Sequence, residues 1–254
     1  MSARGWRLLG GWALALLLAL AFAALGRWQL ARMHEKEHML AAAAQARSQA
    51  QAQAQPRPLL LASDPARAQA YDWAAGRGVL ADATVWLDNQ QREGRVGVRM
   101  YCVLLPEDGA QALLVDAGWW PLSGDRALPA PGCPRVADQA VRGLLAPPPA
   151  EGLAHGAPLA RQADGRWLAV RLDLPAIAAA LGLRTRIAPR VLRLDPVHRQ
   201  GDAGVMLAPG QRDLDILPNT LTPERHLGYA VQWFGLALAA LVTAIVLTIR
   251  SRSR

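Results

Sequence analysis

Two long runs without a charged residue, one near each end of the chain, set the strongest limit on its fold. Tyr229–Ile249 is uncharged over 21 positions and reaches roughly 31 Å as a helix, about the thickness of a bilayer's hydrocarbon core. Leu8–Leu25 is a second uncharged run, reaching roughly 27 Å as a helix. We therefore expect two transmembrane helices, with residues 26–228 between them.

The placement of charge explains the net charge of +8. All 20 acidic residues lie between the two apolar runs. Five arginines lie outside the runs, at positions Arg4, Arg7, Arg250, Arg252 and Arg254. Because basic residues beside membrane spans mark the cytoplasmic side, residues 1–7 and 250–254 are predicted to be cytoplasmic and the middle of the chain extracytoplasmic. The basic ends are thus topology signals, and we expect no nucleic-acid partner.

The first run has an alternative interpretation as a cleaved signal peptide. Arg4 and Arg7 suit a charged n-region, and Ala21–Ala23 resembles a cleavage site. The run is longer than the usual h-region of ~7–15 residues, which favours an uncleaved anchor. No presequence precedes it, so we expect a bacterial inner membrane with the middle domain in the periplasm.

The residues between the spans divide into a helical stalk and a β-rich domain. Residues 26–57 are rich in good helix formers, with no Gly or Pro from Arg27 to Gln55. Within residues 58–228, apolar and polar residues alternate with period two from about Gly76, and further apolar runs are separated by turn signals, which predicts an α+β domain with a mainly antiparallel sheet. The expected strands begin near Gly76 and then cover Val96–Leu105, Ala112–Ala117, Arg135–Leu145, Trp167–Leu172 and Arg190–Leu194. One short helix is expected after an Asp173 cap.

The remaining reactive residues give little sign of an enzyme. Cys102 and Cys133 fall in the exported segment, where a disulfide can form, but they are no C-x-x-C pair. His34 and His38 are four apart on a predicted helix, a spacing that can hold a metal or simply leave two solvated histidines. His155 and His198 fall in predicted loops and are taken as surface residues. Neither a G-x-S-x-G motif nor a Gly-rich phosphate loop is present, and we expect no catalytic residues.

A histidine at the edge of the second span is the main candidate for a binding site. His226, Tyr229 and Trp233 are three and seven apart, which predicts a shared helix face. Tyr and Trp also form aromatic belts at membrane boundaries, an interpretation that needs no ligand. Trp28, Gln29 and Arg32 leave the first span at the level of His226 if the two helices pack together. Such a setting suits axial ligation of a haem and pairing of its propionates.

Three separated motifs make the chain resemble the Surfeit locus protein 1 family. They are GRWQLARMHEK (Gly26–Lys36), LLVDAGWWP (Leu113–Pro121) and HLGYAVQWFGLAL (His226–Leu238). The stretch from Trp86 to Leu105 also matches that family's strand-turn-strand segment. The motifs occur in the family's order, and the resemblance extends from Gly26 to the second span.

The resemblance implies a membrane-bound, non-enzymatic assembly factor for haem–copper cytochrome c oxidase. Such a protein aids delivery of haem a to the largest oxidase subunit, with haem-synthesis enzymes as further candidate partners. It makes His226 the candidate iron ligand. The candidate haem-binding residues are His226, Tyr229, Trp233, Trp28 and Arg32. Whether haem is held stably or only transferred is left open.

Two departures from the family pattern concern partner contacts. Asp116-Ala117 precedes Gly118-Trp119 where family members usually have Asn-Arg. Pro223–Arg225 stands where a more Asn-rich approach to His226 is usual.

Two other classes of protein were weighed against the assembly factor. A two-span sensor or docking protein would carry an extracytoplasmic ligand domain and no haem. We disfavour the sensor because only seven residues precede the first run and five follow the second, which is too few for a signalling module. A membrane-anchored hydrolase would need a nucleophile motif that the sequence lacks.

Overall fold

The structure confirms an α+β protein in which two long apolar helices flank a mixed β-sheet domain. It is a computed structural model that describes residues 3–53, 55–109, 111–149, 156–197, 211–217 and 220–252. His155 and His198 lie outside the described residues. The chain divides into a helical unit, Met1–Met39 with Thr220–Arg254, and a β unit, Leu40–Asn219. Each unit is described separately below.

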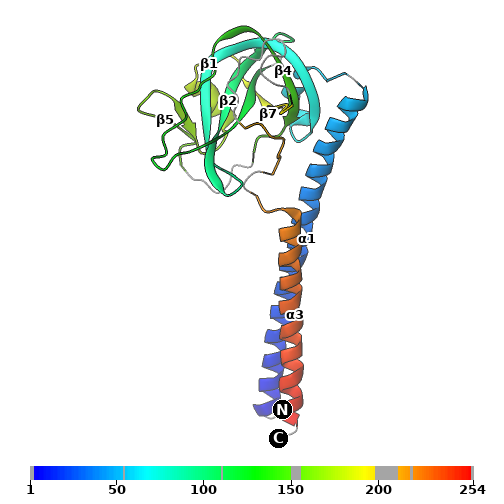
Figure 1. Cartoon of the computed structure of the whole chain (residues 1–254). Helices are drawn as coiled ribbons and strands as arrows, with labels where there is room; N and C mark the ends of the chain where they lie inside the picture. Colours follow the sequence, from blue (N-terminus) through cyan, green and yellow to red (C-terminus); the bar gives the residue numbers. More distant parts are fainter. Residues whose placement is uncertain are drawn as a thin grey trace. The chain divides into compact units, whose positions relative to one another are not determined.

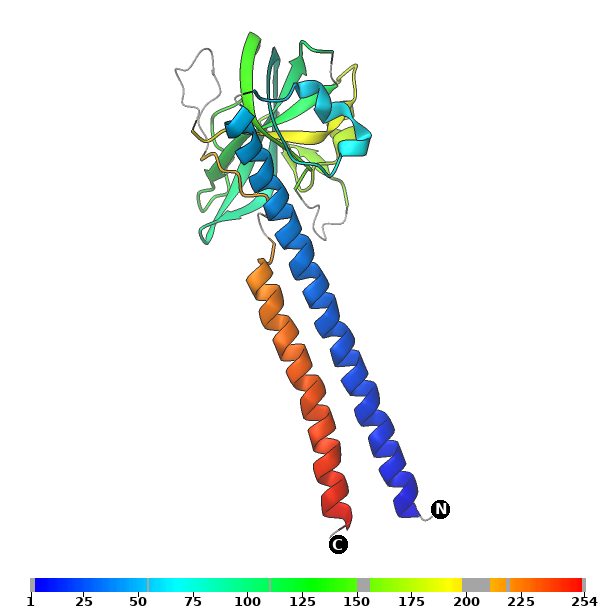
Figure 2. The ribbon, with the colours of Figure 1, turned by 90° about the vertical axis from the view of Figure 1, so that its right-hand side faces the viewer.

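The helical unit is built from α1 (Ala3–Gln53) and α3 (Pro223–Arg252), both long and apolar enough to cross a membrane. Helix α1 also extends into the β unit and ends shortly before Pro56, as its helix-forming composition predicts. The start of α1 and the end of α3 lie at the same end of the unit (Figures 1 and 2). The two helices are therefore antiparallel.

Five strands of the β unit pair in a closed ring. The strands are β1 (Asp72–Arg92), β2 (Arg95–Pro106), β3 (Ala112–Pro121), β4 (Val136–Ala146), β5 (Leu159–Arg161), β6 (Trp167–Ala169) and β7 (Ile187–Leu194). Pairing runs β1–β2–β3–β7–β4 and back to β1, which closes a barrel. Strand β6 pairs with Val85–Leu87 of β1, and β5 pairs with β6. The β3–β7 and β1–β6 pairs are parallel and the others antiparallel. Closure leaves the five barrel strands without a free edge.

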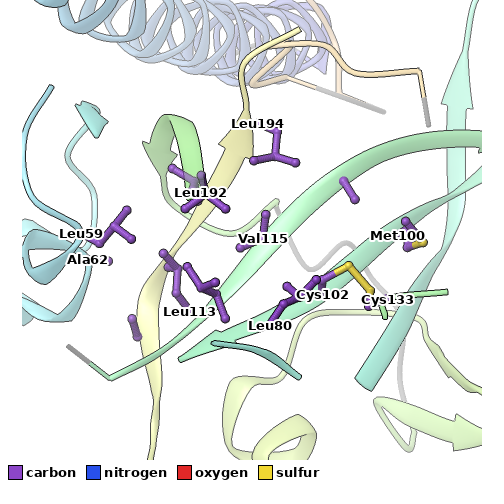
Figure 3. Packing of buried hydrophobic residues seen from close by; sticks show 14 of the residues in the cluster. Leu59, Ala62, Leu80, Met100, Cys102, Leu113, Val115, Cys133, Leu192 and Leu194 are labelled. Atoms are coloured by element: carbon purple, nitrogen blue, oxygen red, sulfur yellow. A yellow bond between two sulfur atoms is a disulfide. The ribbon is translucent and has the colours of Figure 1, made fainter. Parts of the chain in front are cut away.

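The barrel strands bury both of their faces, because successive side chains point to opposite sides of a strand. One cluster receives side chains from all five barrel strands and fills the barrel, with Leu80, Met100, Leu113, Val115 and Leu192 among its members (Figure 3). The second cluster lies on the other face, under β6 and the short helix α2 (Leu174–Ala180). The alternate positions of β2 show the division: Cys102 belongs to the first cluster and Val103 to the second.

A buried ion pair holds two 3-10 turns, Leu59–Ser63 and Pro65–Arg67, against the barrel. Arg190 of β7 is fully buried and donates to Asp72 over 2.6 Å, and also to the carbonyl oxygen of Leu61. Arg67 donates to the same carboxylate over 2.6 Å. Since a buried charge without a partner is costly, this network fixes where the segment before β1 packs.

A second charge cluster anchors the segment 211–217, which precedes α3 in sequence. The Asp213 carboxylate accepts hydrogen bonds from Arg99 at 2.6 Å and Arg92 at 3.1 Å. Arg193 donates to the carbonyl oxygen of Asp215. Arginines from three strands thus bind one short stretch of chain.

The strands lie where the sequence predicts them, but several differ in length from the predicted ranges. Strand β2 and strand β4 differ by one residue at each end from the predicted ranges, and Asp173 caps α2 by accepting from the Ala176 amide at 3.0 Å. Strand β1 begins at Asp72, before the predicted start near Gly76, because its first residues pair with β4. Strand β5, with three residues, was not predicted. The last turns of α1 pack Ala43, Ala46 and Ala50 against the β unit, so this part is more than a spacer.

Cys102 and Cys133 form a disulfide inside the first cluster (Figure 3). The bond joins residues 31 apart in sequence and therefore restricts the unfolded chain. Replacing both cysteines by alanine is expected to lower the free energy of unfolding of the β unit by roughly 3–4 kcal/mol. Urea unfolding of the purified protein, followed by tryptophan fluorescence, measures this difference. Equal unfolding midpoints for the wild type and the double variant would contradict it.

The Asp72 network is expected to make stability depend on acidic pH. Burial disfavours the ionised carboxyl, but hydrogen bonds from Arg67 and Arg190, with their charges, outweigh it and hold the pKa of Asp72 below its ordinary 3.8. A carboxyl with such a lowered pKa stabilises the fold fully above its unfolded pKa and loses this effect as pH falls through the folded pKa.

We therefore predict that Asp72→Asn costs about 3 kcal/mol or more at neutral pH, because Arg190 is left buried without its charge partner. The difference between variant and wild type should shrink as the pH falls below about 4. Unfolding curves of both proteins from pH 7 to pH 2 test this. A difference that does not change with pH would show that the carboxylate charge is unimportant.

Candidate functional site

The candidate site lies on a seam of inward-facing side chains between α1 and α3. On α1 the buried and half-buried positions follow spacings of three and four: Trp12, Ala15, Ala19, Phe22, Gly26, Gln29, Met33 and Lys36. Several seam positions are alanine or glycine, and small residues let two helices approach closely. At Gly26 an added Cβ would meet the Phe234 ring at 2.8 Å. The seam is therefore a close helix–helix contact with the period of a coiled coil.

Contacts at three levels set the register of the two helices. Trp12 Nε1 donates to Thr248 Oγ1 over 3.0 Å near the start of α1. Phe22 and Trp233 stack with ring centroids 5.7 Å apart. Farther along α1, the His226 imidazole Nδ1 lies 2.6 Å from the Gln29 side-chain oxygen. This register brings His226 and Gln29 together although they are 197 positions apart in sequence.

The hydrogen bond to Gln29 determines the state of the imidazole. The amide oxygen is an acceptor, so Nδ1 carries the proton and Nε2 keeps a free lone pair. Both side chains are buried, with His226 only 6% exposed and Gln29 8% exposed. A buried, hydrogen-bonded Nδ1–H is the arrangement that orients a histidine as a metal ligand through its other nitrogen.

Local sequence places His226 in the first turn of α3. The run Thr222-Pro223-Glu224 is a strong helix start, with Pro as the first helical residue and an acidic residue in the first turn. The backbone amides of Arg225 and His226 donate to the Thr222 carbonyl oxygen. Pro223–Arg225, which departs from the family pattern, therefore fixes the helix start, and the position of His226 follows from it.

The other predicted site residues occupy different surroundings. Trp233 lies on the seam, as its spacing of seven from His226 predicts. Tyr229 is 41% exposed, and the next residue, Ala230, takes the seam position because a helix turns by 3.6 residues. Trp28 is 54% exposed and points away from the seam. Arg32 is half-buried and forms an ion pair with Glu35 at 2.5 Å. The structure thus pairs His226 with Gln29 and places Trp233 about two turns farther along the seam, stacked on Phe22, while Tyr229 and Trp28 lie off the seam.

Lys36 is a site residue that the sequence patterns did not reveal. It is the only lysine of the chain and is 6% exposed on the seam of α1. Arg32, Lys36 and the carboxylate Glu35 are all close enough to act electrostatically on the His226 imidazole. The heptad spacing from Gln29 through Met33 to Lys36 is the signal that would have found it. The site therefore combines an oriented imidazole with two nearby cations.

The middle motif LLVDAGWWP has a structural role in this chain. Asp116 accepts from Arg99 at 3.0 Å and from the Gly118 amide at 3.0 Å, and both charged side chains are buried. Ala117 is fully buried in the first cluster at a shift in the pairing of β3 with β2. The motif is thus a bulged strand, and Gly118 takes the positive φ of 121° that glycine tolerates.

The donor set of the helical site fits a haem. The imidazole Nε2 has the lone pair that an iron ligand needs, and Arg32 and Lys36 can pair with carboxylates such as propionates. Trp233 and Phe22 supply aromatic surface along the same seam. Among the described residues, no group of three His, Cys, Asp or Glu side chains is placed to hold a metal ion.

Comparison with known proteins identifies the relatives of the chain. The model of the SURF1 family matches residues 16–238, most of the chain's length. A search of curated proteins found no match.

Removing the acceptor at Gln29 is expected to release the imidazole from its fixed state. In Gln29→Leu the buried Nδ1–H has no partner, which costs about 1–3 kcal/mol and favours transfer of the proton to Nε2. Nitrogen-15 NMR of histidine-labelled protein should show the Nδ1–H form of His226 in the wild type and loss of that form in the variant. Gln29→Asn, which keeps an amide oxygen, serves as the matched control. A wild-type His226 with its proton on Nε2 would contradict the assignment.

Proposed function

This chain belongs to the SURF1 family, a family of cytochrome c oxidase assembly factors, and we propose that it binds haem a and aids its insertion into the largest oxidase subunit. In this proposal haem is the cargo of the protein. No chemical step is required of the chain, so the protein acts as a carrier and docking factor without catalytic residues.

The buried Gln29–His226 hydrogen bond is the observation that carries the proposal. An unpaired polar group between two apolar helices is costly, and Gln29 and His226 satisfy each other there. A lone pair held on Nε2 is what an axial ligand of haem iron requires. Because His226 is only 6% exposed, binding requires the imidazole to turn outward or the helices to separate locally. Reversal of that change would favour release of the cargo.

The two nearby cations support an anionic cargo. Lys36 has no hydrogen bond or ion pair with another described residue, and its burial on the seam makes an unpaired ammonium unfavourable. A haem propionate paired with Lys36 would supply a hydrogen-bonded partner charge, whereas a second propionate would compete with Glu35 for Arg32. The apolar faces of the macrocycle would lie against the apolar helix surface beside the seam.

The two units suggest a division of roles. We propose that the helical unit lies in a bacterial inner membrane with both termini cytoplasmic and that the β unit lies in the periplasm. The flanking arginines support this orientation, and the disulfide suits an oxidising compartment. The β unit would then dock the largest oxidase subunit, with haem-synthesis enzymes as further partners. Trp28 and Tyr229, both exposed, remain candidates for contact with the bound haem.

The role of His226 in assembly is tested in cells that lack their own copy of this protein. Wild-type chain should restore the haem a content of the purified oxidase, whereas His226→Ala should lower it severalfold at equal protein level. Leu238→Ala, an exposed apolar position on the same helix, is the matched control and should restore assembly. Full assembly with His226→Ala would reject His226 as the working residue.

The role of Lys36 is tested by the affinity for haem in detergent. Lys36→Met keeps the apolar stem and removes the charge, and loss of one charge-assisted hydrogen bond predicts about tenfold weaker binding. Arg27→Met, an exposed arginine about two and a half turns earlier on α1, should bind as the wild type does.

Haem with esterified propionates distinguishes charge pairing from packing. It should bind wild-type protein and Lys36→Met equally, because neither can form the ion pair. A tenfold loss that persists with the ester would show that Lys36 acts through structure alone.

A further inference from the structure

Two histidines on α1 form a pair that the proposed haem site does not use. His34 and His38 occupy the same face of a continuous helix, because residues four apart lie one turn above each other. Both are exposed, and the side chain of His34 is 62% accessible. Their Cβ atoms are about 5–6 Å apart on such a helix, which lets two imidazoles reach one ion. Neither side chain is on the seam with α3.

Glu37 adds an independent sign of a ligand site. Its carboxylate oxygen lies 3.1 Å from Nδ1 of His34. A carboxylate that accepts from one imidazole nitrogen leaves the other nitrogen with a free lone pair and raises its basicity as a ligand. His34 is therefore oriented with Nε2 available for a metal ion.

The sequence of this segment, His-Glu-Lys-Glu-His, also fits the H-E-x-x-H pattern of zinc peptidases. Those sites need a third ligand and a glutamate free to act as a general base. Here Glu35 is paired with Arg32 at 2.5 Å. No third ligand group joins the histidines among residues for which the structure gives side-chain positions. The arrangement suits binding of a metal and does not support hydrolysis.

We propose that His34 and His38 bind one divalent transition-metal ion, with Glu37 as the residue that orients His34. Two imidazoles prefer copper, nickel or zinc over calcium or magnesium. The order of intrinsic affinities makes Cu²⁺ the most tightly bound of these ions. Two protein ligands leave the other coordination positions to water, so the ion should exchange readily. The site is independent of His226 and of any haem.

Calorimetric titration of the haem-free protein in detergent with Cu²⁺ tests the proposal. One Cu²⁺ per chain should bind, and Zn²⁺ should bind more weakly at the same site. His38→Ala should weaken Cu²⁺ binding about tenfold or more, and Glu37→Gln by about tenfold. His226→Ala should leave the titration unchanged. Alanine is a strong helix former, so circular dichroism should confirm an intact helix in His38→Ala.

A relocated histidine gives the sharpest control. The double change His38→Ala with Met39→His keeps five histidines but moves one to a spacing of five, off the shared face. Weak binding in this variant, with loss of the two-nitrogen electron paramagnetic resonance pattern of bound Cu²⁺, would support a chelate across one helical turn. Unchanged binding in either variant, or no Cu²⁺ binding in the wild type, would overturn the proposal.

Discussion

The close packing of α1 on α3 is the constraint on which the candidate site depends. A seam of small residues brings the two backbones together, and the polar groups that fall on that seam must then satisfy each other. Gln29 and His226 do so through a single short hydrogen bond. The same bond gives the imidazole one protonation state and one orientation. The packing of the two helices therefore sets the protonation state and the orientation of the His226 imidazole.

The β unit solves a different physical problem, that of burying both faces of its long strands. Closing five strands into a ring removes their edges and supplies one interior cluster, while α2 and β6 cover part of the outside. Buried arginines are matched to carboxylates at the places where chain segments cross the barrel. Arg190 with Asp72 holds the segment before β1, and Arg99 with Asp213 holds the segment that precedes α3 in sequence.

Sequence patterns predicted local features well because these depend on few neighbours. The uncharged runs indicated both long helices, the apolar run after the Glu93-Gly94 turn indicated β2, and Asp173 marked the start of α2. Barrel closure depends on pairing β1 with both β2 and β4, which no local pattern encodes. The parallel pairing of β3 with β7 could not be predicted from the sequence for the same reason.

The candidate site was predictable in part. The spacing of seven between His226 and Trp233 predicted that both lie on one helix face. Tyr229, three residues after His226, was predicted to share that face, but it is exposed and Ala230, four residues after His226, is buried instead. The partner of His226 is an amide 197 positions away, and Lys36 is buried although no local pattern of charge predicts it. Those contacts arise only when two distant segments pack. The sequence motif contained Gln29 without indicating what it binds.

The most direct test of this account is the optical spectrum of protein purified in detergent after co-expression with haem a synthesis, measured for the wild type and for His226→Ala. We expect a Soret band in the wild type that is lost or shifted in the variant, because His226 supplies an axial ligand to the iron. Folded wild-type protein without haem would contradict the carrier function and leave the β unit as a docking module. The same band in both proteins would retain the carrier and remove His226 as its ligand.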